Sequence, residues 1–292
     1  MRLLHRIRLF EGGPVEPPDD AITVYWTTDS HLYSPLDGGP GEDPNGPNAE
    51  VGTRHFWKAP ARLRQFVQAV NAAPQCDLVA HTGDMLQRGT DWGYFTQWWD
   101  DINLPVPQVL TPGNHDFAGS DYETVVAGLG LDGQPEIAGS KLNHSFRVER
   151  GDHAYRMIVA DTNYLEDYSH GSITAMRFHP DGLDWIASEL ASCPEDDVII
   201  WTHGAIHEFL GHFYEPSAQS FRSVVEAAQA ARPALRVSCL FGHYHRTTMR
   251  VWESLGPRLP GYSSPAMCED FTERYCVVRA WTGQVLVEEH GW

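Results

Sequence analysis

The sequence has little that would place it outside a reducing compartment or in a membrane. Its five cysteines are odd in number and form no C-x-x-C pair, so they indicate neither a disulfide framework nor a thiolate zinc site. No stretch approaches the length of a membrane span. The basic start, residues 1–10, lacks the apolar core of a signal peptide. We therefore expect a cytoplasmic protein.

Positive charge is also scarce. Lys and Arg together number 21 against 39 Asp and Glu, which gives a net charge of −18. Because such a surface repels polyanions and anionic lipids, we expect no nucleic-acid groove and no membrane partner. The length allows two domains, but we find no internal repeat and no low-complexity linker that would separate them. We expect one domain over residues 1–292, and the sequence sets no expectation for the oligomeric state.

The chain does contain many short, apolar, β-favouring runs. Strands are predicted at 21–28, 76–82, 106–110, 142–150, 155–161, 197–202, 236–241, 275–281 and 284–288. Helical spacing of apolar residues predicts helices over 59–73, near 92–99 and from 182 onward. Strands that alternate with helices in this way indicate an α/β fold.

Side chains that can bind metals follow five of these runs. They are Asp29 and His31, then Asp84, then Asn114 with His115 and Asp116, then His203, and last His243 with His245. Each alone has an ordinary explanation, since Asp and Asn favour turns and a histidine can lie at a surface. Core packing does not require that five strands each be followed by Asp, Asn or His. Functional residues of α/β sheets lie at the strand ends, so the pattern indicates a site. His81 points the other way from Asp84 in strand register, so we expect it in the core or at its rim.

The chemistry of these side chains suits a pair of metals. Carboxylate and amide oxygens mixed with imidazoles, without thiolates, suit Mn, Fe or Zn ions. Two ions about 3.5–4 Å apart, bridged by a carboxylate, would bind an attacking oxygen and a phosphoryl oxygen together. Asp84 has two oxygens that can form such a bridge, and Gly83 before it lets the backbone approach a bound group closely. The expected cofactors are therefore two divalent or trivalent transition-metal ions.

Five motifs agree in identity, order and context with one known family. They are Asp29-x-His31, Gly83-Asp84-(x)4-Gly89, Gly113-Asn114-His115-Asp116, His203 and Gly242-His243-x-His245. In this order the chain resembles the calcineurin-like metallophosphoesterase superfamily, from the first of these motif-bearing strands nearly to the last strand. The resemblance implies a four-layer α/β/β/α sandwich with a dinuclear metal centre at the strand carboxyl ends. It also implies one metal held by Asp29, His31, Asp84 and His245, and another held by Asp84, Asn114, His203 and His243, with Asp84 bridging.

The same resemblance implies hydrolysis of a phosphoester. Two divalent ions lower the pKa of a water between them and neutralise the phosphoryl oxygens as the leaving oxygen departs. His115 is not a metal ligand in the family. It is predicted to protonate the leaving oxygen or to stabilise its charge, and Asp116 is predicted to orient the His115 ring.

Two segments depart from the family. Many relatives have paired histidines followed by proline at the fourth motif, whereas this chain has Trp201-Thr202-His203-Gly204, so we assign the single ligand His203 there. His207 beyond it is either a substrate contact or a solvated surface residue. The segment 34–50, rich in Gly, Pro and acids, is expected not to pack and is either a lid or disordered.

The leading interpretation is a phosphodiesterase for a small substrate, such as a cyclic nucleotide or a glycerophosphodiester. The compact, histidine-rich pattern is similar to that of the bacterial class III phosphodiesterases, and Arg54 and His55 are candidate contacts with the far side of the substrate. A phosphomonoesterase or a nucleotide-diphosphate hydrolase remains an alternative, because metals recognise the phosphoryl group while loops recognise the rest. A non-catalytic binding scaffold of the same fold is an alternative of another class.

Overall fold

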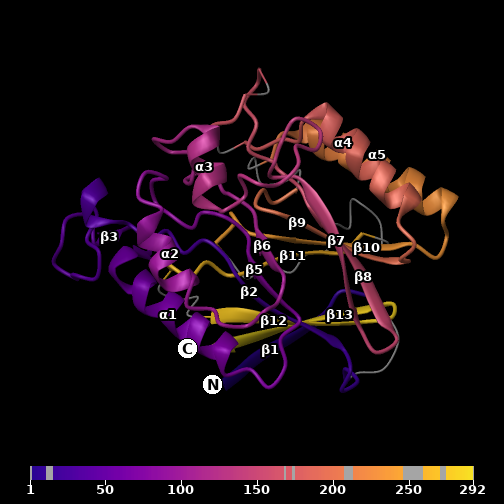
Figure 1. Cartoon of the computed structure of the whole chain (residues 1–292), viewed down its shortest axis with the longest axis horizontal. Coiled ribbons are helices and arrows are strands. Elements are labelled where there is room, and N and C mark those ends of the chain that lie inside the picture. The colour runs from indigo at the N-terminus through magenta and orange to yellow at the C-terminus, as the bar shows by residue number, and fades with distance from the viewer. Residues whose placement is uncertain are drawn as a thin grey trace.

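The protein is a sandwich of two β-sheets between helices. The computed structural model describes residues 2–10, 16–167, 169–172, 175–206, 213–245, 259–269 and 274–291. Sheets of six and five strands pack face to face. Helices α1 (Ala59–Asn71) and α2 (Gly93–Trp99) cover one outer face, and α4 (Pro180–Ser192) and α5 (Glu215–Ala231) cover the other (Figure 1). The predicted four-layer α/β/β/α sandwich is confirmed.

The first sheet has the strand order β1-β13-β12-β2-β5-β6. Its strands are β1 (Arg2–Arg8), β2 (Ile22–Thr27), β5 (Leu78–His81), β6 (Gln108–Leu110), β12 (Arg274–Trp281) and β13 (Gln284–Gly291). β2, β5 and β6 run parallel, whereas β12 pairs antiparallel with β2. Because parallel strands end at the same edge, the loops after β2, β5 and β6 are neighbours.

The second sheet has the order β11-β10-β9-β8-β7. Its strands are β7 (His144–Arg150), β8 (His153–Val159), β9 (Asp197–Thr202), β10 (Arg236–Phe241) and β11 (Gly261–Ser263). β8, β9 and β10 are parallel, and β7 and β8 form an antiparallel hairpin around Gly151-Asp152. A separate two-stranded ribbon joins β3 (Glu50–Val51) to β4 (Arg54–His55), and the short helix η2 (Phe56–Lys58) follows it.

Alternation along the strands divides the core into apolar layers. On β2, Val24 and Trp26 face the second sheet, whereas Tyr25 faces the helices. Trp26 meets Trp201 of β9 edge-on between the sheets, with ring centroids 5.6 Å apart. His81 is fully buried near α2, so the prediction of a core histidine is confirmed.

The elements that lie outside the predicted set include α3 (Tyr122–Gly128), α5, β1 and β11. The signal for α5 is present in the sequence, because its buried residues Phe221, Val225 and Ala228 recur at helical spacing. The sequence signal for strands β1 and β11 is weaker. Strand β1 depends on pairing with β13, which lies near the other end of the sequence, and β11 has only three residues.

The polar segment 34–50 is folded against the body of the protein. It contains the 3₁₀ turn η1 (Pro35–Asp37), and the residues 39–41 that follow are buried. Glu42 pairs with Arg64 of α1, with Nη2 and Oε2 2.6 Å apart. The expectation that this segment does not pack is wrong, because its successive turns satisfy backbone groups that an irregular polar loop would leave to water.

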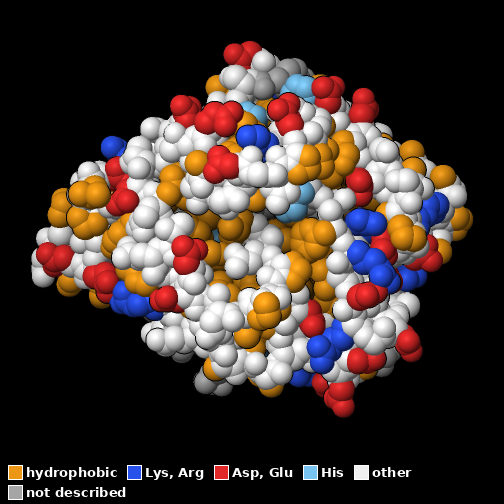
Figure 2. Space-filling view, viewed as in Figure 1, with side chains coloured by type: hydrophobic (Ala, Val, Ile, Leu, Met, Phe, Trp, Pro, Cys, Tyr) orange, Lys and Arg blue, Asp and Glu red, His pale blue; other side chains and the backbone are white. Residues whose placement is uncertain are grey.

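Acidic side chains are spread over the face of the molecule drawn in Figure 2, with basic side chains between them. This agrees with the excess of Asp and Glu in the sequence. Among the helices that the structure describes, none combines the length and the apolar character that crossing a bilayer requires.

Candidate metal centre

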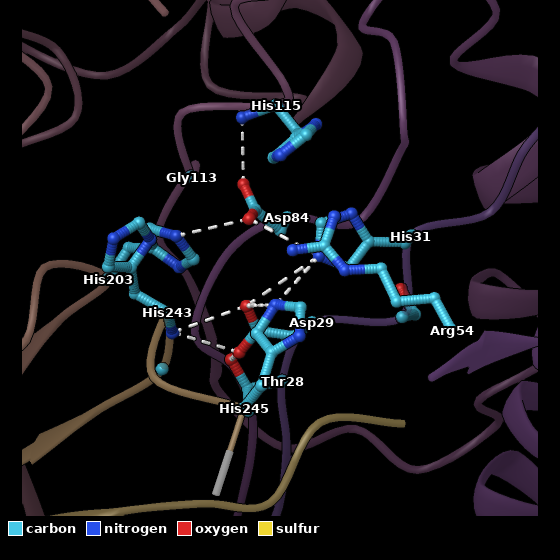
Figure 3. A network of polar contacts seen from close by, with 12 residues as sticks. Thr28, Asp29, His31, Arg54, Asp84, Gly113, His115, His203, His243 and His245 are labelled. Atoms are coloured by element: carbon cyan, nitrogen blue, oxygen red, sulfur yellow. Dashed lines mark hydrogen bonds and ion pairs between the residues drawn. The ribbon is translucent and has the colours of Figure 1, made fainter. Parts of the chain in front are cut away.

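The predicted ligands converge where the two sheets present their carboxyl ends. Loops after β2, β5 and β6 of the first sheet face loops after β9 and β10 of the second, and their side chains point toward one another (Figure 3). The residues that meet there are Asp29, His31, Asp84, His203, His243 and His245. Asn114 lies in the same place, since its neighbours Gly113 and His115 both lie against Asp84.

Asp29, His31, Asp84 and His245 form the first group, in which one ligand atom from each lies within 4.8 Å of the others. His31 Nε2 is 3.4 Å from Asp84 Oδ2, and His245 Nε2 is 3.1 Å from Asp29 Oδ1. The Nε2 atoms of His31 and His245 are 3.0 Å apart. These four residues are the set predicted for one metal.

Asp84, His203 and His243 form the second group, again within 4.8 Å. His203 Nε2 lies 3.4 Å from Asp84 Oδ2, so Asp84 belongs to both groups, as a bridging ligand would. Asn114 Oδ1 is buried, and within the described part of the chain it has no hydrogen-bond partner. Because a buried acceptor without a partner is costly, this atom fits a metal ligand better than a structural amide. The residues therefore fit a dinuclear site.

Three of the imidazole rings are held in orientation by a hydrogen bond of Nδ1, the ring nitrogen that faces away from the cluster. His31 Nδ1 lies 2.8 Å from Gln87 Oε1, His203 Nδ1 lies 2.6 Å from the Thr82 carbonyl, and His245 Nδ1 lies 3.0 Å from Glu269 Oε1. Each partner is an acceptor, so Nδ1 donates and Nε2 is the nitrogen that faces the cluster. Gln87 and Glu269 were not among the predicted site residues, because neither stands in a ligand motif.

Glu269 is expected to support metal binding through His245. Replacing it by alanine should weaken metal affinity by about 10–100-fold, the usual cost of losing such a partner. Glu269→Gln keeps an acceptor oxygen for Nδ1 and should retain most of the affinity. Competition with a chelator of known affinity measures both. Glu50→Ala is the matched control, because Glu50 pairs with His55 on the β3–β4 ribbon, and an equal loss there would contradict the assignment.

The backbone at the centre is strained. Asp29, His31, Asp84, His243 and His245 all have positive φ, between 44° and 67°, and they are five of the seven such non-glycine residues in the described part of the chain. This region costs most L-residues free energy, and it is retained mainly where function requires it. All five are predicted metal ligands, so the strain coincides with the predicted function.

Gly113→Ala is expected to disrupt the centre. A Cβ at this position would lie 2.2 Å from Asp84 Oδ1 and 2.3 Å from the Asp84 backbone nitrogen, so Asp84 would have to move. We expect metal content to fall to a small fraction of that of the unmodified protein, as measured by elemental analysis. Gly133→Ala is the control, because a Cβ there meets nothing within 4 Å. Normal metal content in Gly113→Ala would show that the loop tolerates the shift.

The charges of the cluster favour an ionised Asp84 and a protonated His203. Burial raises the pKa of Asp84, but the imidazoles of His203, His115 and His31 outweigh it and hold this pKa well below its usual range. Burial lowers the pKa of His203, whereas Asp84 and Asp29 raise it, to about 9. Asp84 is therefore ionised at neutral pH, and His203 would have to lose its added proton to serve as a metal ligand.

His115 and Asp116 lie beside Asp84, but Asp116 does not have the predicted role. The His115 backbone N–H donates to Asp84 Oδ1 at 2.8 Å, and its ring Nδ1 lies 3.3 Å from the Gln87 carbonyl oxygen. The Asp116 carboxylate accepts from the backbone N–H groups of Gly113, at 2.8 Å, and Leu86, at 2.9 Å. Asp116 thus joins the loops after β5 and β6, and the prediction that it orients the His115 ring is wrong.

Of the candidate substrate contacts, Arg54 lies at the edge of the cluster beside His31 (Figure 3). Its Nε is 3.9 Å from Glu269 Oε1. The His55 ring lies against Glu50, with Nδ1 3.0 Å from Oε1. His207 lies outside the described residues.

A thiol outside the predicted ligand set also borders the cluster. Cys268 Sγ lies within 4.8 Å of ligand atoms of His31 and His245. Burial raises the pKa of this thiol well above its usual range, so the sulfur stays protonated at neutral pH. The oxygen and nitrogen ligands therefore remain the candidates for metal binding.

The family model described as calcineurin-like phosphoesterase matches residues 22–247, which include every predicted ligand. The chain belongs to this family. It is thus a phosphoesterase of a metal-dependent family, and the residue groups that could hold metals lie where the motifs predicted them.

This phosphoesterase is similar to proteins with several activities. A protein of Psychrobacter arcticus described as a probable cyclic nucleotide phosphodiesterase is 23% identical over 88% of this chain and 84% of its own length. A purple acid phosphatase from yellow lupin (Lupinus luteus) seeds matches 97% of the chain with a TM-score of 0.57 at 14% identity, over 53% of its own length. A putative 5′-nucleotidase from Staphylococcus aureus matches 88% of the chain with a TM-score of 0.51 at 14% identity, over 50% of its own length. The chain therefore spans about half the length of both solved structures, and their likeness concerns the fold.

Proposed function

We propose that this phosphoesterase hydrolyses a small phosphodiester of the cyclic-nucleotide or glycerophosphodiester type. The observation that carries the proposal is the similarity, over 88% of the chain, to a probable cyclic nucleotide phosphodiesterase. The net charge of −18 supports a small substrate, because an anionic surface repels a polyanion.

The cofactors that we propose are two transition-metal ions, with Mn, Fe and Zn as the candidates that the donor atoms support. Asp29, His31, Asp84 and His245 would hold one ion, and Asp84, Asn114, His203 and His243 the other. When bound, such ions act as Lewis acids on a phosphoryl oxygen and lower the pKa of a bound water.

His115 is the residue that we assign to the leaving oxygen. Its ring lies beside the ligands, with its centroid 4.6 Å from that of His31. With Nδ1 directed at the Gln87 carbonyl, Nε2 is the nitrogen available to exchange a proton with the substrate. Arg54 carries a positive charge at the edge of the cluster and is suited to the anionic group of the substrate.

The test compares initial rates on bis(p-nitrophenyl) phosphate and p-nitrophenyl phosphate at matched concentration, with Mn-loaded protein and a chelated control. We expect a chelator-sensitive preference for the diester. That result would direct the search to cyclic nucleotides and glycerophosphodiesters. A preference for the monoester would overturn the proposal in favour of a phosphomonoesterase or a nucleotide-diphosphate hydrolase.

A non-catalytic binding scaffold is the second candidate. Measuring whether the protein hydrolyses any phosphoester distinguishes it from an enzyme. Bound metal with no hydrolysis of either ester or of the proposed natural diesters would favour it. The full set of predicted ligand types argues for catalysis, since a scaffold has no need of them.

We also propose that residues 1–292 form one domain. The pairing of β1 with β13 joins the two ends of the described chain, and β12 lies between β13 and β2. Both observations support a single unit, because the first sheet needs strands from both ends of the sequence.

A further inference from the structure

A hollow lined by both apolar and polar residues lies on the outer helical layer. The hollow, of about 180 Å³, opens between the first turns of α4 and α5. Its lining includes Arg177, Tyr214, Ser217 and Ser220, and it includes none of the predicted metal ligands. The hollow is therefore separate from the candidate metal centre.

Arg177 is buried here without an adequate partner. Its side chain is only 9% exposed, and its Nε has no hydrogen-bond partner among the residues that the structure describes. Its ion-pair contact is with Glu166, 3.9 Å from Nη2, and the Glu166 side chain is 91% exposed. A contact that solvent screens to this extent contributes little. Burying a guanidinium costs free energy unless its N–H groups are paired, so the structure leaves a charge at the hollow that lacks compensation.

Two contacts that use no side-chain N–H group also hold Arg177 in position. The guanidinium carbon lies 4.3 Å from the centre of the Tyr214 ring, a cation–π contact that covers one face. The Arg177 backbone N–H donates to the Thr162 carbonyl at 3.0 Å, which fixes the chain behind it. The edge of the guanidinium, where its donors lie, is the part that a ligand can bind.

Two further features of the hollow favour a negative charge. Helices α4, of 13 residues, and α5, of 17 residues, both begin at it, and the N-terminal end of a helix dipole is positive. Ser217 Oγ accepts from the Phe178 backbone N–H at 3.0 Å, which leaves the hydrogen of its own hydroxyl free to donate.

We propose that this hollow is a binding site for a small oxyanion, of the carboxylate or phosphate class, held by Arg177 between the first turns of α4 and α5. A guanidinium edge binds such oxyanions through two parallel hydrogen bonds. The acidic residues in the first turns of the two helices, Asp181 and Glu215, disfavour a polyanion, so the ligand is small. This inference does not depend on the proposed phosphodiesterase activity.

The experiment follows thermal unfolding of the metal-loaded protein while sodium chloride is exchanged for sodium sulfate or sodium acetate at constant ionic strength. A bound ligand raises the unfolding midpoint saturably, whereas a general salt effect does not saturate. We expect a saturable rise, with affinity at least about tenfold weaker in Arg177→Met, because the charge-assisted hydrogen bonds are lost. Arg222→Met is the matched control, since Arg222 pairs with Glu226 on the exposed side of α5, and it should respond like the unmodified protein.

Crystals of the loaded protein soaked in selenate locate the site, because selenium gives an anomalous signal. A peak beside Arg177 that is absent in Arg177→Met supports the proposal. An unchanged response of Arg177→Met to both anions, with selenate only at the metal centre or nowhere, would overturn it. If Arg177→Met does not fold, Tyr214→Ala and Arg177→Lys replace it, and both should weaken binding without abolishing the fold.

Discussion

Loss of metal from both sites is the expected result of replacing Asp84 by alanine. Asp84 Oδ2 lies 3.4 Å from the Nε2 atoms of both His31 and His203, so it is the one carboxylate shared by the two ligand groups. Removing a residue that hydrogen-bonds a metal ligand lowers metal affinity by about 10–100-fold. Removing a ligand that both metals share should lower it by more than about 100-fold. Elemental analysis after gel filtration measures the metal content, and hydrolysis of the diester should fall with it.

The fold of the Asp84 variant needs its own control. Removing a buried carboxylate from among imidazoles also changes the charge of the cluster, so circular dichroism and thermal unfolding must show a folded protein. Asp132→Ala, at an exposed loop position, removes the same side chain without touching the centre. Full metal content in a folded Asp84→Ala protein would contradict the bridging role.

The sequence predicted the ligands because of where they lie along the chain. Parallel strands end at one edge, and residues that follow such strands are brought together by the sheet itself. Asp29 after β2 and His243 after β10 are more than 200 residues apart, yet the His243 backbone N–H donates to Asp29 Oδ2 at 2.9 Å. Because β2 and β10 belong to different sheets, this meeting also requires the two sheets to pack with their carboxyl edges together, and the ligand sets themselves were predicted from the family resemblance.

The residues behind the ligands could not be predicted in the same way. Gln87 and Glu269 contact the centre through His31 and His245, and no spacing rule relates them to those histidines. Their positions depend on how the loops close in three dimensions. The same holds for Arg177, whose burial follows from the packing of α4 and α5 and leaves no signal in the sequence.

The mistaken role of Asp116 has a local cause. The prediction rested on its place next to His115, but the chain turns tightly there, with the Asp116 N–H donating to the Gly113 carbonyl. The turn directs the Asp116 carboxylate back to the Gly113 N–H and away from the neighbouring ring. Side chains of the Asp type commonly bond to backbone in such turns, so adjacency in sequence was a weak guide to contact.

A loss of turnover that depends on the leaving group is the expected result of His115→Ala. The variant should keep its metal, because neither group of candidate ligands includes His115. General acid catalysis contributes about 10²–10⁴-fold when the leaving oxygen needs a proton. We therefore expect a loss of this size in kcat for a diester with an alkyl leaving group, such as a glycerophosphodiester.

The p-nitrophenyl diester separates the possible roles of His115. Its leaving oxygen carries a stable negative charge and gains little from a proton, so a general acid at His115 predicts a loss below about tenfold for this substrate. His153→Ala is the control and should leave both rates unchanged. His153 lies on the β7–β8 hairpin, where its ring contacts the Thr282 hydroxyl. An equal loss on the two diesters would contradict proton donation, since His115 would then act on a step common to both, such as stabilising charge on the phosphoryl group through its position beside Asp84.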